Sequence, residues 1–152
     1  MAADLDLVYR DKTRSMHALT RALVARVFHA AKPYLGIKKG MTAELAVTVV
    51  GPTAMRALNR RWRKKDKPTD ILAFPLSGPT ITGYTAVSLG DLFICPAAVE
   101  AKAKAWGSPL RVQMKWTVVH GLLHLAGYDH EKSPAAARRM ETAEQKILKS
   151  IG

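Results

Sequence analysis

The chain has 152 residues, of which 48% are hydrophobic and 24% are charged, a mixture typical of a folded domain and not of a disordered chain. Lys and Arg outnumber Asp and Glu by 24 to 12, and the formal net charge of +12 favours a polyanionic partner such as nucleic acid. A single cysteine, Cys95, excludes an intramolecular disulfide framework and a cysteine-based zinc ribbon. No apolar run reaches the roughly 18–20 residues of a membrane span, and the N-terminus lacks a signal-peptide segment. We therefore expect one cytoplasmic domain over residues 1–152, with no membrane contact.

The first part of the chain is expected to contain two helices and a strand. Apolar residues recur at helical spacing through residues 14–35, which predicts a helix that ends at Gly36. The β-branched and apolar run over 44–50 predicts a strand. Pro52 is suited to the first position of a second helix.

Two strands and three helices are expected in the rest of the chain. Residues 71–74 and 86–95 are apolar and β-branched enough to form strands, and the turn-forming residues around Pro79 and Gly83 predict a loop between them. The three helices are expected to open at prolines, in two cases after a serine suited to capping: Pro96, Ser108-Pro109 and Ser133-Pro134. This order of elements predicts an α+β fold with helices packed on a small mixed sheet.

Half of the net charge lies in a short segment. Residues 51–67 carry seven cations and one anion, whereas residues 68–100 contain no Lys or Arg at all. We interpret the cation-free stretch as buried structure and the basic segment as an electrostatic footprint for a polyanion. The seven cations are Arg56, Arg60, Arg61, Arg63, Lys64, Lys65 and Lys67.

Three of the five histidines fall within eleven residues, in the pattern His120-x3-His124-x2-Gly127-x2-His130. Four residues advance a helix by about 400°, so His120 and His124 are expected one above the other on one helical face. Gly127 is suited to the left-handed position that ends a helix, after which His130 can supply a third nitrogen. Three protein ligands leave one coordination position for water, the arrangement of a catalytic zinc site.

The histidine pattern alone leaves two alternatives open: histidines that bind no metal, and a metal-dependent peptide hydrolase. Separate core or surface histidines would need no metal, although the spacing favours a metal site. His17 and His29 lack matching partners, and we interpret them as ordinary residues of the first helix. The spacing equals that of the metzincin proteases, but Gly121 stands where those enzymes have a glutamate base, so peptide hydrolysis is disfavoured.

Three blocks carry a family resemblance: the histidine motif over 120–130, the run over 58–75 with its Thr-Asp-Ile-Leu-Ala-Phe-Pro segment, and Leu-Gly-Asp-Leu-Phe-Ile-Cys over 89–95. Together they resemble the bacterial YbeY family, endoribonucleases that act on single-stranded RNA in rRNA maturation. The blocks occur in the family's order and span about half of the chain. One departure is Ala73, where the family usually has a serine before Phe-Pro.

The resemblance implies a zincin-like α+β domain in which His120, His124 and His130 bind the metal. It also implies action on the 3′ end of small-subunit rRNA, with ribosomal subunits and assembly factors as partners, and a functional Arg63. A guanidinium can meet two phosphate oxygens with its planar fork, so Arg63 is a candidate catalytic residue that steadies the scissile phosphate. Charge alone would instead make it a solvated cation. Five neighbours are interpreted as general phosphate contacts: Arg60, Arg61, Lys64, Lys65 and Lys67.

Four other residues near these motifs have a possible functional or structural role. Trp62 is suited to stacking on an unpaired base or to packing. Asp129 could orient a ligand imidazole or cap the turn before His130. Glu131 is a candidate base without a spacing argument, and Cys95 is expected to be a small buried residue.

The resulting hypothesis is a metal-dependent endoribonuclease of ribosomal RNA. Zinc suits three neutral imidazoles, although nickel, cobalt and copper also accept them. One alternative is a non-catalytic rRNA-binding assembly factor whose metal is structural, and another is a peptide or amide hydrolase. The sequence leaves open whether water or the adjacent 2′-hydroxyl attacks the phosphate.

Overall fold

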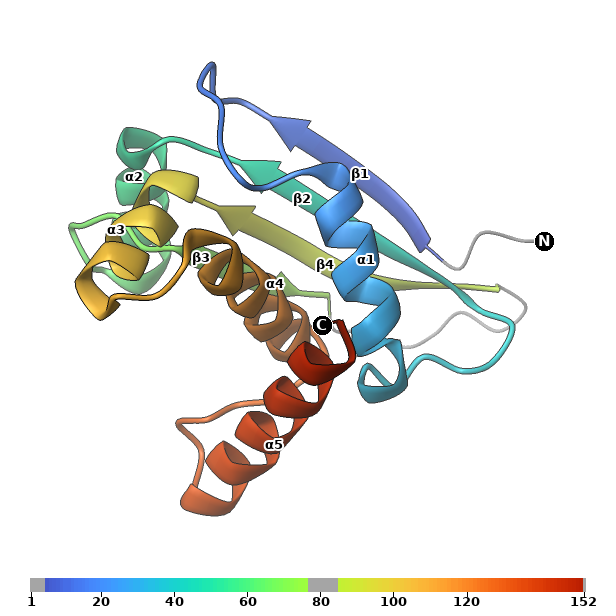
Figure 1. Ribbon diagram of the computed structural model, residues 1–152. Helices are drawn as coiled ribbons and strands as arrows, with labels where there is room; N and C mark the ends of the chain where they lie inside the picture. Colours follow the sequence, from blue (N-terminus) through green and yellow to red (C-terminus); the bar gives the residue numbers. More distant parts are fainter. Residues whose placement is uncertain (1–4, 77–84, 152) are drawn as a thin grey trace.

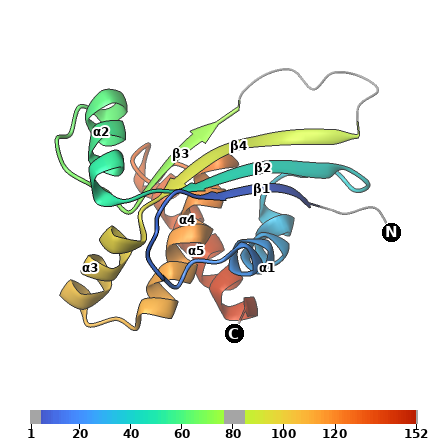
Figure 2. The same ribbon diagram turned by 90° about the horizontal axis from the view of Figure 1, so that it is seen from above.

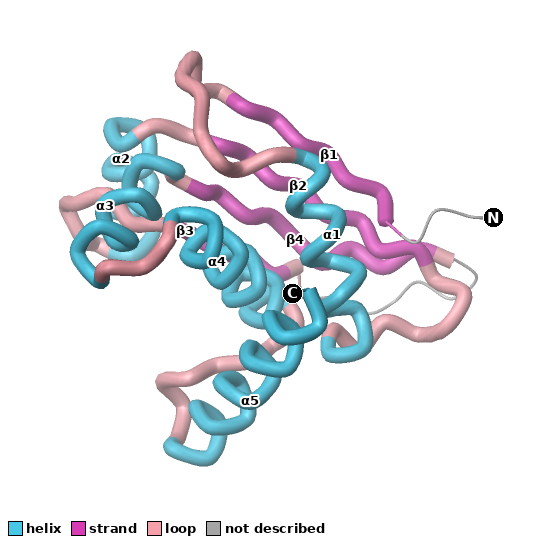
Figure 3. Tube along the Cα trace, in the orientation of Figure 1, coloured by secondary structure: helices cyan, strands magenta, loops and turns pink. Residues whose placement is uncertain are grey.

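The computed structural model describes residues 5–76 and 85–151, and the loop expected around Pro79 and Gly83 lies outside them. The described chain forms four strands, five α-helices and one 3-10 turn (Figures 1 and 3), which confirms the predicted α+β class. In chain order the elements are β1 (Leu5–Asp11), α1 (Arg21–Ala31), η1 (Lys32–Tyr34), β2 (Thr42–Val49), α2 (Pro52–Arg63), β3 (Ile71–Pro75), β4 (Ala86–Ile94), α3 (Pro96–Trp106), α4 (Leu110–Leu125) and α5 (Pro134–Ile151).

The strands form one mixed sheet in the order β1-β2-β4-β3. β1, β2 and β4 are parallel, and β3 pairs antiparallel with β4 at the edge of the sheet. Figure 2 shows α1, α4 and α5 on one face of the sheet, with α2 set apart from them at one end. Helices α2 and α3 follow the carboxyl ends of β2 and β4, and antiparallel β3 begins at that same end. Several chain segments therefore converge there.

Strand β1 was not expected from the sequence, in which residues 5–11 look like a polar terminus. The strand pairs with β2 along its whole length, from Leu5 opposite Ala43 to Asp11 opposite Val49. Leu7 is buried, and Leu5 and Tyr9 pack against the same core from alternate positions. The pairing with β2, a partner more than 30 residues away, turns a weak local pattern into a strand.

The first helix is shorter than the predicted span of 14–35. It begins after Thr20, whose hydroxyl oxygen accepts a hydrogen bond from the backbone N–H of Leu23 at 3.1 Å. It ends at Ala31, where Pro33 belongs to the 3-10 turn η1. His17 therefore lies before the helix, where its Nε2 atom is 2.7 Å from Asp11, while His29 is an exposed residue within it.

The predicted helix starts are confirmed at Pro52, Pro96 and Pro134. Ser133 caps the last helix, because its hydroxyl oxygen accepts a hydrogen bond from the N–H of Ala136 at 3.0 Å. The start expected at Pro109 is wrong by one residue. Pro109 is itself the extended N-cap of α4, and its carbonyl accepts the hydrogen bonds from Val112 and Gln113.

Two apolar clusters hold the helices on the sheet. The larger one lies between the sheet and helices α1, α4 and α5, and the smaller one packs beneath α2 around Met55 and Cys95. Strand β3 contributes to both, because successive side chains point to opposite faces: Ile71 joins the larger cluster and Leu72 the smaller. Cys95 is fully buried, as expected, and its burial raises the pKa of the thiol.

None of the helices in residues 5–76 and 85–151 combines the length and the apolar character needed to cross a bilayer.

Candidate metal centre and RNA cleft

His120 and His124 project from one face of α4, the helix that packs against β3, α1, α3 and α5. Their Nε2 atoms are 3.0 Å apart and their ring centroids are 4.6 Å apart. Residues four apart share one face of a helix, about 6 Å apart along its axis, so their side chains can converge. The last two turns of α4 thus direct two imidazole nitrogens to one point.

A tight turn after α4 brings the third histidine to the same place. Gly127 has a φ of 99°, and the N–H of Tyr128 donates back to the carbonyl of Leu123 at 3.0 Å, which ends the helix as predicted. The His130 ring lies 5.5 Å from each of the other two rings, measured between centroids. Each of the three histidines offers a nitrogen, and these nitrogens all lie within 4.8 Å of one another.

The donor set fits a divalent transition metal. Two imidazole nitrogens on a tetrahedral zinc are about 3.3 Å apart, given Zn–N bonds of about 2.0–2.1 Å, and the observed 3.0 Å between His120 and His124 is close to that value. Burial lowers the pKa of His124, and the neighbouring imidazoles of His120 and His130 lower it further. A lowered pKa keeps His124 in the neutral form, which is the form that binds metals.

A buried carboxylate from α5 reaches the metal centre, and it was not predicted from the sequence. Glu144 Oε1 lies 3.0 Å from Nδ1 of His120, and Oε2 accepts a hydrogen bond from the indole N–H of Trp116 at 2.9 Å. The signal available in the sequence was its position: Glu144 falls among the apolar residues of α5, between Met140 and Ile147. A carboxylate on a buried helical face needs a partner.

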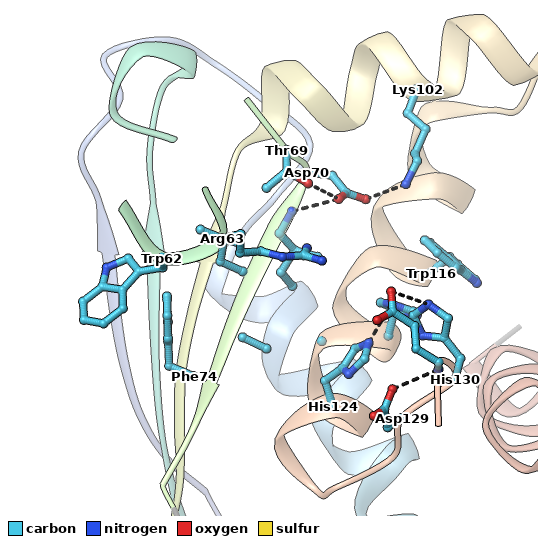
Figure 4. A pocket seen from close by; sticks show the side chains of 16 residues that line it. Trp62, Arg63, Thr69, Asp70, Phe74, Lys102, Trp116, His124, Asp129 and His130 are labelled. Carbon is cyan, nitrogen blue, oxygen red and sulfur yellow. Dashed lines mark hydrogen bonds and ion pairs between the residues drawn. The ribbon is translucent and has the colours of Figure 1, made fainter. Parts of the chain in front are cut away.

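The histidines line a cleft of about 370 Å³ that also holds Arg63 (Figure 4). One wall is strand β3, the opposite wall is α4, and the C-terminus of α2 closes one side with Trp62 and Arg63. Ala73, one departure from the resembled sequence pattern, lies on the β3 wall. Because β3 begins at the end of the sheet where α2 ends, the fold brings Arg63 to the histidines from about 60 positions away in the chain.

Arg63 differs from Arg56 and Arg60, two other arginines of α2, because those two side chains have an acidic partner. Arg56 forms an ion pair with Asp66 at 2.8 Å, and Arg60 approaches the same carboxylate at 3.8 Å. Arg63 is exposed, points into the cleft in Figure 4, and forms no hydrogen bond or ion pair with any residue in the described ranges. Its guanidinium is therefore available to a ligand.

The five other predicted phosphate contacts are exposed on α2 and the loop that follows it, beside the cleft and not in its lining. Arg61 lies over the ring of Trp62, with 5.2 Å between the guanidinium carbon and the ring centroid. The structure thus places Arg63 with the histidines and the remaining cations on the adjoining surface, where Arg60, Arg61, Lys64, Lys65 and Lys67 lie.

An ion pair between Lys102 and Asp70 also lines the cleft, and it was not predicted from the sequence. Lys102 of α3 forms an ion pair with Asp70 at 2.9 Å, and its ammonium lies 5.0 Å from the Trp106 ring centroid and 5.3 Å from that of Trp116. Asp70 also accepts a hydrogen bond from the N–H of Ile71 at 3.0 Å, so it anchors the start of β3. The pair fixes α3 to the strand that forms one wall of the cleft.

The residues with two interpretations are also placed by the structure. Asp129 accepts a hydrogen bond from the N–H of Glu131 at 2.9 Å, which is the capping role and not contact with an imidazole. Glu131 is exposed, with its carboxylate 3.9 Å from Nε2 of His130. Trp62 is 57% exposed and packs edge-to-face on Phe74, with 5.6 Å between ring centroids, so packing covers only part of its indole.

Comparisons with known proteins agree with this architecture. The family model described as Endoribonuclease YbeY matches residues 7–152. A protein named Endoribonuclease YbeY from Halorhodospira halophila is 44% identical over 114 residues, which are 74% of this chain and 73% of that protein. Another of the same name from Anaeromyxobacter sp. is 38% identical over 138 residues, or 91% of this chain and 70% of the other.

A solved structure has the same fold. The solution structure of TM1509 from Thermotoga maritima matches with a TM-score of 0.65 and 25% sequence identity, over 96% of this chain and 89% of that one. The family model and the 138-residue match with the Anaeromyxobacter protein both span the part of the chain that holds the three histidines and Arg63. The chain therefore belongs to the endoribonuclease YbeY family.

Proposed function

We propose that this protein is a metal-dependent endoribonuclease that cleaves single-stranded RNA during maturation of the 3′ end of small-subunit rRNA. The observation that carries the proposal is that three convergent histidines share one open cleft with Arg63, which has no ion-pair partner among the described residues. The relatives of this chain are named endoribonucleases. The partners would be the small ribosomal subunit and its assembly factors, and the setting the cytoplasm. One domain over residues 1–152 would carry the whole activity.

In this proposal His120, His124 and His130 hold the metal, for which we propose zinc. Three imidazoles are a donor set that zinc accepts. A cation bound there would polarise a phosphoryl oxygen or lower the pKa of a water molecule. The lowered pKa of His124 favours its ligand form at neutral pH.

Arg63 would act on the scissile phosphate. Negative charge grows on the non-bridging oxygens as the phosphodiester is attacked, and a guanidinium donates two parallel hydrogen bonds to such oxygens. Arg63 has no ion pair with any described residue, so no such contact has to break before its guanidinium binds a phosphate. Beside the cleft, Arg60, Arg61, Lys64, Lys65 and Lys67 would contact the RNA backbone on either side and make binding salt-dependent.

The alternative of a structural metal in a non-catalytic assembly factor is less favoured. Structural zinc sites are closed by four protein ligands. In the described parts of the chain, the three histidines gain no fourth Cys, His, Asp or Glu ligand, and they line an open cleft.

The test is cleavage of a labelled single-stranded RNA by the metal-loaded protein. We expect His120→Ala to abolish cleavage and Arg63→Ala to slow it by about 100- to 1000-fold, the cost of removing one oxyanion donor. Arg138→Ala, an exposed arginine on α5 outside this cleft, is the matched control and should cleave normally. Cleavage by Arg63→Ala at the rate of the control would exclude the catalytic role of Arg63. No cleavage by the wild-type protein would exclude the nuclease.

A further inference from the structure

Glu144 is a charged side chain in an apolar setting. It is only 8% exposed and lies on the face of α5 that buries Met140, Ala143 and Ile147. Burial of a carboxylate costs free energy unless hydrogen bonds or an ion pair compensate for the lost water. The apolar residues of α5 already pack it against α1 and α4, so the buried carboxylate requires a reason of its own.

Both partners of Glu144 lie on α4, one turn apart. Oε2 accepts the indole N–H of Trp116 at 2.9 Å, and Oε1 lies 3.0 Å from Nδ1 of His120. The Trp116 ring stacks on the His120 ring, with 4.7 Å between centroids and 24° between planes. The His120 imidazole is therefore held through its face by Trp116 and through its edge by Glu144.

These contacts determine which nitrogen of His120 carries the proton. An indole N–H is only a donor, and a carboxylate oxygen is only an acceptor. With Oε2 satisfied by Trp116, Oε1 can accept only a proton carried on Nδ1 of His120. The Nε2 atom is then left with a lone pair, and this is the atom 3.0 Å from Nε2 of His124 in the histidine cluster.

We infer that Glu144 is a positioning residue of the metal centre, which fixes His120 in the Nδ1–H form and directs its Nε2 lone pair to the metal. The inference rests on the proposed metal site and deepens it. A carboxylate behind a histidine ligand orients the ring and strengthens its basicity, and loss of such a partner costs about 10- to 100-fold in metal affinity. The carboxylate comes from a helix that contributes no ligand of its own.

The variant that tests this is Glu144→Gln. The glutamine amide has only one acceptor oxygen, so it can accept a hydrogen bond from Trp116 or from His120 but cannot replace both carboxylate oxygens. The indole can only donate, so the amide oxygen is expected to stay with Trp116 and the amide N–H₂ to face His120. Nδ1 must then accept a hydrogen bond, and the proton moves to Nε2, from which a metal must displace it before it can bind. The matched control is Glu141→Gln, the same change at an exposed position of the same helix.

The first measurement is zinc affinity by chelator competition, with circular dichroism to verify folding. We expect Glu144→Gln to bind about 10- to 100-fold more weakly than the wild type, and Glu141→Gln to bind equally well. Affinity equal to that of the control would overturn the role of Glu144. Wild-type protein that binds no zinc would overturn the proposed metal site instead, so the two failures are distinguishable.

The second measurement needs no metal. Long-range ¹H–¹⁵N spectra of the metal-free protein, at about pH 8 and so above the ordinary histidine pKa of about 6.5, report which nitrogen of His120 is protonated. We expect Nδ1–H in the wild type and in Glu141→Gln, and Nε2–H in Glu144→Gln. The same form in all three proteins would overturn the inference, and this readout separates orientation of the ring from mere attachment of α5.

A third variant provides a rescue. Trp116→Phe removes the indole donor, so in the double variant with Glu144→Gln the amide oxygen is free to accept from Nδ1 of His120. The double variant is expected to regain the Nδ1–H form and to bind zinc more tightly than Glu144→Gln alone. If the folded double variant still carries the His120 proton on Nε2 and binds zinc no more tightly than Glu144→Gln, Glu144 acts only by joining α5 to α4.

Discussion

Gly121 of α4 and Ile71 of β3 pack so closely that a Cβ atom on Gly121 would overlap Cδ1 of Ile71. The same Cβ would lie 3.1 Å from Cδ2 of Leu92 on β4. The position directly after the first histidine therefore lies against β3 and β4, at the floor of the cleft, with no space for a side chain. A glutamate base of the metzincin kind has no room there, and this steric fact agrees with the disfavoured peptide-hydrolase alternative.

The contact predicts how substitutions at these two positions combine. Gly121→Ala alone should lower the free energy of unfolding by about 1–2 kcal/mol, because overpacking outweighs the gain in helix propensity. Ile71→Val removes Cδ1, so Gly121→Ala should be better tolerated in that background, with a coupling energy of about 0.5–3 kcal/mol. Urea unfolding of the wild type, both single variants and the double variant measures this. Strict additivity would contradict the contact.

Lys64 carries the one positive φ found outside glycine in the described residues, 58°, at the left-handed C-cap of α2 directly after Arg63. A side chain in this conformation costs about 1 kcal/mol relative to glycine. Lys64→Gly should raise the free energy of unfolding by about 0.5–1 kcal/mol in thermal or urea denaturation. Lys65→Gly, which removes the same charge one residue later, should give no such gain. Equal effects of the two changes would show that Lys64 is not strained.

Features encoded within one segment of chain were predictable from the sequence. The histidine spacing, the glycine that ends α4 and the Ser133 cap each depend on residues within one or two helical turns. The strands 71–75 and 86–94 carry their own apolar and β-branched signals, and the predicted spans of 71–74 and 86–95 agree with them to within one residue at each boundary. Local patterns suffice where the partner atoms are local.

Features that depend on distant partners were not predictable in the same way. Strand β1 forms by pairing with β2, and the residues of 5–11 carry no local pattern that predicts this pairing. The sequence suggests Asp129 as the carboxylate behind the histidines because it is adjacent to them, whereas the carboxylate that contacts His120 comes from α5, 24 residues away. Arg63 joined the site only through the family resemblance, because charge alone did not separate it from six neighbouring cations.

Trp62 is expected to act as a platform for an unpaired base. Its indole is 57% exposed at the mouth of the cleft beside Arg63, and Phe74 supports it edge-to-face from below. Stacking of a base on such a ring contributes about 1–3 kcal/mol. Trp62→Ala should therefore weaken binding of a single-stranded oligonucleotide by about 5- to 150-fold, and Trp62→Phe should retain most of the affinity.

Fluorescence anisotropy with a labelled oligonucleotide measures this effect, and an abasic oligonucleotide of the same length is the control. The phosphates of the abasic strand are intact but the bases are missing, so wild type and Trp62→Ala should bind it equally. A loss of the same size with both oligonucleotides would assign Trp62 to packing and not to base contact.

The stability of the metal-free protein should depend on His124 in mildly acidic solution. Burial, and then the neighbouring imidazoles, lower the pKa of His124 below its ordinary value of 6.5. In the unfolded chain the same ring takes up a proton as the pH falls through about 6.5. The unfolded state thus binds more protons in the window between the two pKa values. The free energy of unfolding must therefore fall as the pH decreases from above 6.5 toward the lower pKa.

Urea titrations in the presence of a chelator, at about pH 7.5 and about pH 5 on either side of the ordinary histidine pKa, measure this loss. His124→Gln cannot take up the proton in either state, so it should lose less free energy between the two pH values than the wild type. His29→Gln removes an exposed histidine of α1 and should keep the wild-type dependence. Equal losses for His124→Gln and the wild type would mean that the partly buried ring does not resist protonation, and that its surroundings do not maintain the neutral ligand form of His124.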